Sequence, residues 1–438
     1  MSTSFLPDAG QPEPVVPPPA GDGAPPGGWP NPGTAFRLLL GLAGIGAAMA
    51  NLVPAVLTLS IKASAIDEPR ATTIVSLVVS ISALCSMIAF PAFGRLSDRT
   101  TSRWGRRRPF LLLSALLFAI GGVGTAAATG TLALVLAAIA TAVGFSAATV
   151  ALNALVADQF EPLRRGTVSA VLGLSLPVGV VIGLFLAQLV SPHLNAMILL
   201  PAGIGVIGCV LFAVLVKDQQ VTVVDRTPFG LSQLVSTYWV SPLRSPDFAW
   251  AWFSRFLIFF GVAAIQAYQA FYLMRVFHYT PDKIAGVVFL STLVLTGGAL
   301  IFAPIAGKLS DRTGRRKPFV IAAALIFGTG LLLAAIADSF SFFLVAVAVV
   351  GIGQGVYFAV DIALVTQLLP DPANPAKDLG IMNLANNLPS SVVPALAPAI
   401  LAIGASAASP QNFPLLFVCG AVAGLLGAAL IIPIAKVR

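Results

Sequence analysis

Two ionisable residues, Asp361 and Arg255, lie inside long apolar stretches of the sequence. Asp361 lies about nine residues from one end of its stretch, which corresponds to roughly 13 Å at 1.5 Å per residue. Arg255 lies at a comparable depth in another stretch, so the two could form an ion pair. Because ionisable groups at membrane depth are costly and usually functional, we hypothesise that Asp361 takes up and releases a proton and that Arg255 tunes its proton affinity. Alternatively, the pair only locks two helices together, or Arg255 extends to the lipid headgroups. Asp158, at the end of another stretch, is a weaker candidate.

Uncharged polar side chains recur at helical spacing in the same stretches. Gln354 and Tyr357 would share a helix face with Asp361, and Gln266 and Gln269 would share one with Arg255. Lipid does not accommodate amides cheaply, so these groups should face a cavity or a neighbouring helix. A solute with several hydroxyl groups fits the first option, and hydrogen bonding between helices fits the second. The candidate solute-binding residues are Asn153, Gln266, Gln269, Tyr272, Gln354, Tyr357, Asn383 and Asn387.

The composition indicates which elements position these residues. Apolar residues make up 57% of the 438 and charged residues only 10%, whereas soluble proteins carry roughly 25% charged residues. Apolar stretches long enough to cross a bilayer as helices recur along the chain. We therefore predict an all-α integral membrane protein with twelve transmembrane helices, at residues 37–61, 71–93, 109–128, 131–157, 167–190, 194–216, 248–274, 283–306, 318–337, 341–369, 379–404 and 412–434.

The net charge of +8 fits either a nucleic-acid partner or a membrane topology, and the placement of the charges decides between them. Apart from Arg255, only Lys62, Arg70, Arg275 and Lys283 of the 25 basic residues fall outside the connections expected on one side of the membrane. Basic residues resist translocation. We therefore expect a multi-pass protein of the inner cell membrane with both termini in the cytoplasm and no nucleic-acid partner.

The connections also divide the chain into parts. Residues 1–34 are rich in Pro and Gly and predict a disordered cytoplasmic tail. The longest interior connection, residues 217–247, separates six predicted spans from six others. The expected organisation is an N-terminal six-helix bundle over 35–216, a cytoplasmic linker over 217–247 and a C-terminal six-helix bundle over 248–438.

A short motif occurs once in each half of the chain. Its first part, Gly94-Arg-Leu-Ser-Asp98-Arg99-Thr, recurs 213 residues later as Gly307-Lys-Leu-Ser-Asp311-Arg312-Thr. Its second part, Gly105-Arg106-Arg107-Arg108-Pro109-Phe110, recurs 209 residues later as Gly314-Arg315-Arg316-Lys317-Pro318-Phe319. Duplicated helical halves of this kind are typical of transporters.

At these residues the chain resembles the major facilitator superfamily, whose loop after the second helix carries a Gly-x-Leu-x-Asp-Arg-x-Gly-Arg-Arg pattern. The first copy, from Ser97 to Phe110, resembles the version in sucrose-type and related glycoside-cation symporters. The resemblance implies two six-helix bundles related by a pseudo-twofold axis, with the first, fourth, seventh and tenth helices around a central cavity. It also implies that the motifs form a cytoplasmic gate, which would comprise Gly94, Asp98, Arg99, Arg106, Arg107, Gly307, Asp311, Arg312, Arg315 and Arg316. The alternative is that the basic residues only anchor the topology.

We therefore expect a secondary active transporter, and no enzyme, that moves a small solute, preferably a sugar or glycoside, by proton-coupled alternating access. The alternative is a proton-antiport exporter of apolar small molecules, since no Trp falls in the core of a predicted span to stack on a sugar ring. The chain lacks the Gly-x-x-x-x-Gly-Lys-Ser/Thr motif of an ATP-driven pump. We expect no cofactor and no metal. The expected partners are the solute, a proton and the lipid bilayer, and we expect a monomer.

Overall fold

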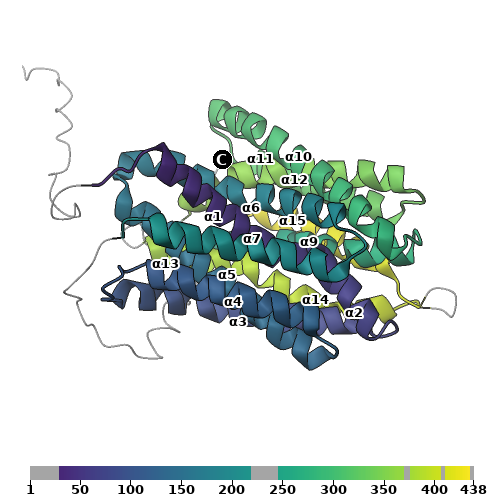
Figure 1. The fold of residues 1–438 in the computed structure, drawn as a ribbon. Helices are drawn as coiled ribbons and strands as arrows, with labels where there is room; N and C mark the ends of the chain where they lie inside the picture. The colour runs from purple at the N-terminus through teal and green to yellow at the C-terminus, as the bar shows by residue number, and fades with distance from the viewer. Residues whose placement is uncertain (1–28, 219–244, 369–374, 406–409, 435–438) are drawn as a thin grey trace, which may run out of the picture.

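The structure is a computed structural model that describes residues 29–218, 245–368, 375–405 and 410–434. Within these ranges it contains twelve helical segments that are long and apolar enough to cross a membrane. They run alongside one another through the long dimension of the molecule (Figure 1). The predicted all-α fold with twelve spans is therefore confirmed. Most of the predicted tail (1–28) and of the predicted linker (219–244) lies outside the described residues.

The twelve spans divide into two groups of six. The first group contains α1 (Thr34–Val53), the π-helical η1 (Pro54–Thr58), α2 (Leu59–Ile66), α3 (Ala71–Arg99), α4 (Arg108–Ala127), α5 (Thr131–Gln159), the short 3-10 helix η2 (Pro162–Arg164), α6 (Arg165–Leu189) and α7 (Leu194–Leu215). The second contains α9 (Pro246–Arg275), α10 (Pro281–Thr313), α11 (Lys317–Ala335), α12 (Phe340–Thr366), α13 (Pro375–Asn387), α14 (Pro389–Ala402) and α15 (Phe413–Ile431). The most extensive helix packing lies within each group, which makes two six-helix bundles.

Two spans that the hydropathy pattern predicts as continuous helices are interrupted by proline. In the first span, the Leu59 amide donates to the carbonyl of Pro54, five residues earlier, and residues Pro54–Thr58 form a π-helical turn. In the eleventh span, α13 ends at Asn387 and α14 begins at Pro389. Proline has no amide hydrogen and its ring disturbs the preceding turn, so each break falls at a proline.

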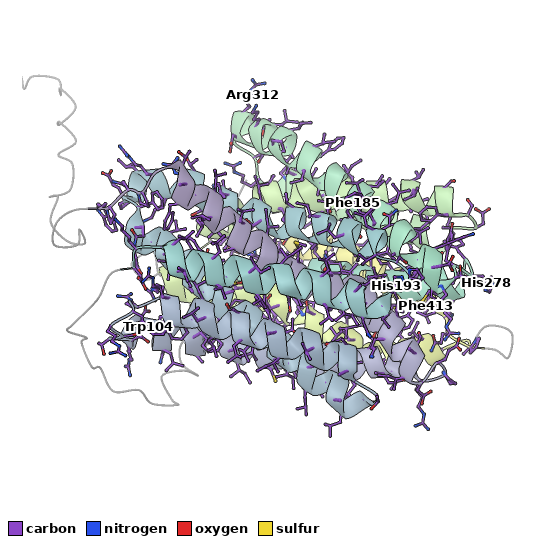
Figure 2. All side chains as sticks on the ribbon, in the orientation of Figure 1. Trp104, Phe185, His193, His278, Arg312 and Phe413 are labelled. Atoms are coloured by element: carbon purple, nitrogen blue, oxygen red, sulfur yellow. The ribbon has the colours of Figure 1, made fainter. Side chains whose placement is uncertain are left out.

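The two ends of the molecule are distinct. Trp104, in the loop between α3 and α4, lies at one end, and His193 and His278 lie at the other (Figure 2). We call these the Trp104 end and the His278 end. Because consecutive spans alternate in direction, α3 and α10 both terminate toward the Trp104 end. The two copies of the motif therefore lie at the same end, as the duplication predicts.

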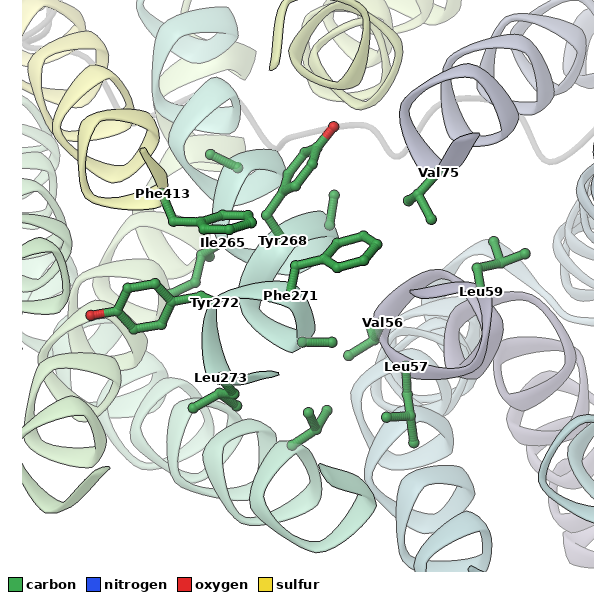
Figure 3. Packing of buried hydrophobic residues seen from close by; sticks show 14 of the residues in the cluster. Val56, Leu57, Leu59, Val75, Ile265, Tyr268, Phe271, Tyr272, Leu273 and Phe413 are labelled. Atoms are coloured by element: carbon green, nitrogen blue, oxygen red, sulfur yellow. The ribbon is translucent and has the colours of Figure 1, made fainter. Parts of the chain in front are cut away.

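A core at the His278 end joins the bundles around α9 (Figure 3). Tyr268, Phe271 and Tyr272 of α9 are fully buried there. Phe413 of α15 packs on one side of α9, and Val56 of η1 faces it from the other bundle. Within lipid, helices associate through close packing and hydrogen bonds rather than through the hydrophobic effect. This packing therefore places α9 between the two halves.

Candidate functional site

An ion pair joins α9 and α12 inside the C-terminal bundle. Arg255 Nη2 lies 3.0 Å from Asp361 Oδ2, and the two side chains are only 10% and 7% exposed. Tyr357, one turn before Asp361 on α12, donates its hydroxyl to Asp361 Oδ1 over 2.8 Å. The structure thus brings together three residues that the sequence had placed on two separate helices.

A fourth residue, Asn386 of α13, completes this cluster. Arg255 donates from Nε to Asn386 Oδ1 over 2.5 Å, while its Nη2 faces Asp361. The sequence reasoning selected the neighbours Asn383 and Asn387 and missed Asn386. Its position three residues after Asn383 in an Asn-Asn pair was the available signal. The planar guanidinium of Arg255 therefore connects α12 to α13.

The chemistry open to this cluster is reversible protonation of Asp361. A carboxylate this deeply buried needs a cation and hydrogen-bond donors, and Arg255 and Tyr357 supply them. If Asp361 takes up a proton, Arg255 becomes a buried cation without a counter-charge, which is strongly unfavourable. Protonation of Asp361 would therefore destabilise the buried position of the Arg255 side chain.

A cavity of about 290 Å³ lies between the two bundles. Its walls come from α1, η1, α2, α3, α4, α5 and α6 of the N-terminal bundle and from α9, α13 and α14 of the C-terminal bundle. Phe90 and Phe145 supply aromatic surface, with their rings perpendicular and 6.5 Å apart. The described lining residues include no charged side chain, and their hydrogen-bonding members are Asn51, Ser82, Ser86, Thr125, Thr141, Gln266, Asn387 and Ser390.

Of the predicted solute-binding residues, two line this cavity. Gln266 reaches it from α9 and Asn387 from the end of α13. Gln354 and Tyr357 instead line a packing gap inside the C-terminal bundle that has no room for a water molecule. Asn51, beside the π-helical turn, is the lining amide that sequence reasoning missed; its proximity to Pro54 in an apolar span could have indicated it.

The other four predicted residues point elsewhere. Tyr272 donates its hydroxyl to the Ala334 carbonyl over 2.9 Å within its own bundle. Gln269 is buried and donates to Thr292 Oγ1 over 3.4 Å. Asn153 is exposed and donates to the carbonyl one turn earlier on its own helix, and Asn383 is exposed on α13. The structure does not bring these four to the central cavity.

At the Trp104 end of the N-terminal bundle, Arg107 joins two acids. Its guanidinium lies 2.9 Å from Asp98 and 2.8 Å from Asp158, and it also donates to Ser97 Oγ. Arg106 pairs with the same Asp98 at 2.9 Å. Burial lowers the pKa of Arg107, but hydrogen bonds and charges from Asp158 and Asp98 outweigh burial, so its pKa is raised. Arg107 therefore remains a cation at any accessible pH.

The C-terminal bundle repeats a reduced form of this arrangement. Arg316 lies 2.6 Å from Asp311 and donates to Ser310 Oγ over 2.9 Å, as Arg107 does to Asp98 and Ser97. The residue 209 positions after Asp158 is Gln367, so this copy lacks the second acid. The remaining predicted gate arginines, Arg99, Arg312 and Arg315, are exposed.

The second glycine of each motif copy has a conformational reason. Gly105 and Gly314 have φ values of +103° and +64°, in the region that favours glycine. A Cβ on Gly105 would also lie 2.4 Å from Asp218 Oδ2. A Cβ on Gly94 would meet nothing within 4 Å, and one on Gly307 would meet only Ala359 at 3.8 Å. The positive φ therefore explains the second glycine in both copies, and packing adds a reason at Gly105 alone; neither explains the first glycine.

The loop after α3 is also tied to the end of α7. Asp218 accepts the amide hydrogens of Arg107 and Arg108 over 2.5 and 3.0 Å, which caps the start of α4. Arg108 donates to the carbonyls of Val214 and Val216. Its counterpart Lys317 donates to two carbonyls after α15, so the same tie exists in both bundles.

Toward the His278 end, the two bundles are joined by polar contacts. The hydroxyls of Ser76 in α3 and Tyr268 in α9 lie 2.6 Å apart and are buried. Gln411 donates to Thr72 Oγ1 over 2.6 Å. Arg275 pairs with the Glu68 carboxylate at 3.1 Å. These contacts hold α3 and the connection before it against the C-terminal bundle.

Sequence comparison relates this chain to a family of membrane transporters. A family model described as Major Facilitator Superfamily matches residues 38–299 and 289–437. The uncharacterized MFS-type transporter YfiU of Bacillus subtilis is 36% identical over 99 residues, which are 23% of this chain and 19% of that protein. The chain thus matches only about a fifth of the length of this relative.

Solved structures share the whole fold at low sequence identity. The nucleoside transporter NupG matches 92% of this chain and all of its own, with a TM-score of 0.73 and 11% identity. A D-xylose-proton symporter matches 92% of this chain and 98% of its own, with a TM-score of 0.69 and 15% identity. A bacterial homologue of the lysosomal transporter Spinster, in an inward-facing and occupied conformation, covers 92% and 97%, with a TM-score of 0.69 and 14% identity.

Proposed function

This chain belongs to the Major Facilitator Superfamily, and on that premise we propose that it carries a small, uncharged, hydroxyl-bearing solute, preferably a sugar or glycoside, together with a proton. The observation that carries this proposal is the separation of two sites. A buried acid with an arginine lies inside one bundle, and between the bundles lies a cavity whose described lining residues carry no charge. The first site suits a proton and the second a neutral solute.

The cavity supports the solute class. The hydroxyl and carboxamide groups within its largely apolar lining offer both donors and acceptors, as a polyhydroxylated molecule requires. Its volume of about 290 Å³ lies just below the roughly 300–1,000 Å³ typical of small-molecule sites. Two proteins of similar fold, the nucleoside transporter NupG and a D-xylose-proton symporter, carry hydroxyl-bearing solutes.

The second candidate function is export of apolar small molecules by proton antiport. Phe90 and Phe145 in the lining favour it, as does the lack of Trp among the described lining residues. The two functions differ in which molecule binds and in which direction the proton gradient drives it.

We also propose an orientation and a gate. The excess of basic residues at the Trp104 end supports a cytoplasmic location for that end in the inner membrane. Polar contacts at the His278 end support a state in which the outer side is closed. The motif clusters around Arg107 and Arg316 would hold the cytoplasmic ends of their bundles as rigid units that pivot during transport, and the protein would work as a monomer.

The test uses purified protein in proteoliposomes with an imposed proton gradient. We expect gradient-driven accumulation of radiolabelled sucrose or xylose, and we expect Asp361→Asn to abolish accumulation while sparing exchange of the same sugar. Accumulation that survives Asp361→Asn intact would show that the proton site is wrongly assigned. Gradient-driven movement of ethidium with no sugar transport would favour the exporter.

A further inference from the structure

We propose that Asn386 is the positioning residue through which the proton site acts on the solute cavity. This inference rests on the proposed function of Asp361. Asn386 accepts from Arg255 Nε over 2.5 Å, while Arg255 Nη2 lies 3.0 Å from Asp361. The next residue along α13, Asn387, lines the cavity between the bundles. Adjacent residues of one helix therefore face the two sites.

The step from proton to helix movement follows from electrostatics. Neutralising Asp361 leaves the Arg255 guanidinium buried without a counter-charge, and such a group relaxes toward a better solvated position. The Nε hydrogen bond ties Arg255 to Asn386, so a shift of the guanidinium pulls on α13. Successive helical residues differ by about 100° in direction, because a turn holds 3.6 residues. A small rotation of α13 therefore displaces both Asn386 and Asn387.

The eleventh span connects α13 to the wall of the cavity through a break in the helix. It breaks after Leu388, because Pro389 has no amide hydrogen to continue the helix. Beyond the break, α14 packs extensively on α3 of the other bundle, and its Ser390 and Pro394 line the cavity. A movement of α13 would thus reach the wall of the cavity and the interface between the bundles through the break at Leu388.

A purely structural role for Asn386 needs a matched control, and Trp252 provides one. Its Nε1 donates to the Ile381 carbonyl over 2.9 Å, which is a second bond between α9 and α13. The described contacts of Trp252 do not include Asp361 or Arg255. Trp252→Phe therefore removes a bond between the same two helices without touching the ion pair.

The test does not require a known solute. In a variant with Cys85, Cys209 and Cys419 replaced by Ala, Ser390→Cys places one thiol in the cavity wall. Its alkylation rate is measured in acidic and in neutral buffer and divided by the rate of free N-acetylcysteine at the same pH, because only the thiolate reacts and every thiol therefore reacts faster at higher pH. We expect this normalised rate to depend on pH in the parent and in Trp252→Phe. We expect this pH dependence to be lost in Asp361→Asn and in Asn386→Ala, and to be kept at least in part in Asn386→Gln, which offers Arg255 an uncharged oxygen acceptor.

The other possible results distinguish an error about Asn386 from an error about the proton site. If pH dependence persists in Asn386→Ala but is abolished by Asp361→Asn, the role of Asn386 is wrong and the assignment of the proton site stands. If Trp252→Phe also loses the pH dependence, any weakened contact between α9 and α13 has this effect. Asn386 then has only a structural role, and the inference is overturned. A normalised parent rate that does not change with pH, or a pH dependence of the normalised rate that survives Asp361→Asn, contradicts the proposed function itself.

Discussion

The hydroxyl of Tyr268 lies 2.6 Å from the hydroxyl of Ser76, and this buried bond joins α9 of one bundle to α3 of the other. One turn further along α9, the hydroxyl of Tyr272 donates to Ala334 within its own bundle. Two tyrosines of one helix thus make similar bonds, but only the bond of Tyr268 crosses between the two bundles, which the proposed transport mechanism requires to separate.

We expect Tyr268→Phe to open the His278 end more often, and Tyr272→Phe not to do so. Each change removes one buried hydroxyl bond, worth about 1 kcal/mol, and only the first weakens the contact between bundles. The measurement is alkylation of a cavity cysteine, such as Ser390→Cys, by a membrane-impermeant reagent added from the His278 side. Equal rates in the two tyrosine variants would contradict a gating role for Tyr268.

Breaking the buried ion pair should cost more than removing it. We expect Arg255→Met alone and Asp361→Leu alone each to destabilise the protein by about 3–5 kcal/mol, because each leaves an uncompensated buried charge. The double variant should recover much of the loss, since both charges are gone. Thermal unfolding midpoints of the four proteins in detergent check this. Additive losses in the double variant would show that the two residues do not stabilise each other.

The two copies of the motif should differ in their sensitivity to mutation. Arg107 bridges two acids and its side chain is 3% exposed, whereas Arg316 pairs with one acid and is 17% exposed. We therefore expect Arg107→Gln to reduce transport and stability more than Arg316→Gln. Sugar exchange and unfolding midpoints measure the difference. Gln367→Asp should give Arg316 a second acid and so make the second copy about as sensitive as the first. A larger loss for Arg316→Gln than for Arg107→Gln would contradict this prediction.

Two of the predicted solute-binding amides, Gln266 and Asn153, differ in whether they line the cavity. Gln266 lines the cavity, whereas Asn153 donates to the Thr149 carbonyl of its own helix. We expect Gln266→Ala to raise the KM for the transported sugar roughly tenfold, which is the effect of losing about 1.4 kcal/mol of binding. Asn153→Ala should leave the KM unchanged. A raised KM in Asn153→Ala would mean that the solute binds outside the cavity described here.

Several features could be predicted from the sequence because they depend on local chemistry. Apolar length and basic connections define the spans, since a bilayer imposes both. The repeated motif places Asp98 and Asp311 at one end, because an even number of spans separates them. The depths of Arg255 and Asp361 made their pairing possible, and the structure brings them to 3.0 Å.

Only the tertiary structure decided which polar groups meet. Helical spacing assigned Gln266 and Gln269 to one face, but the first lines the cavity and the second is buried beside α10. Asn386 and Asp158 gained their partners from other helices, at sequence separations that no periodicity encodes. Periodicity specifies a face of a helix, whereas rotation and packing of neighbouring helices determine whether that face meets a cavity, a charge or lipid.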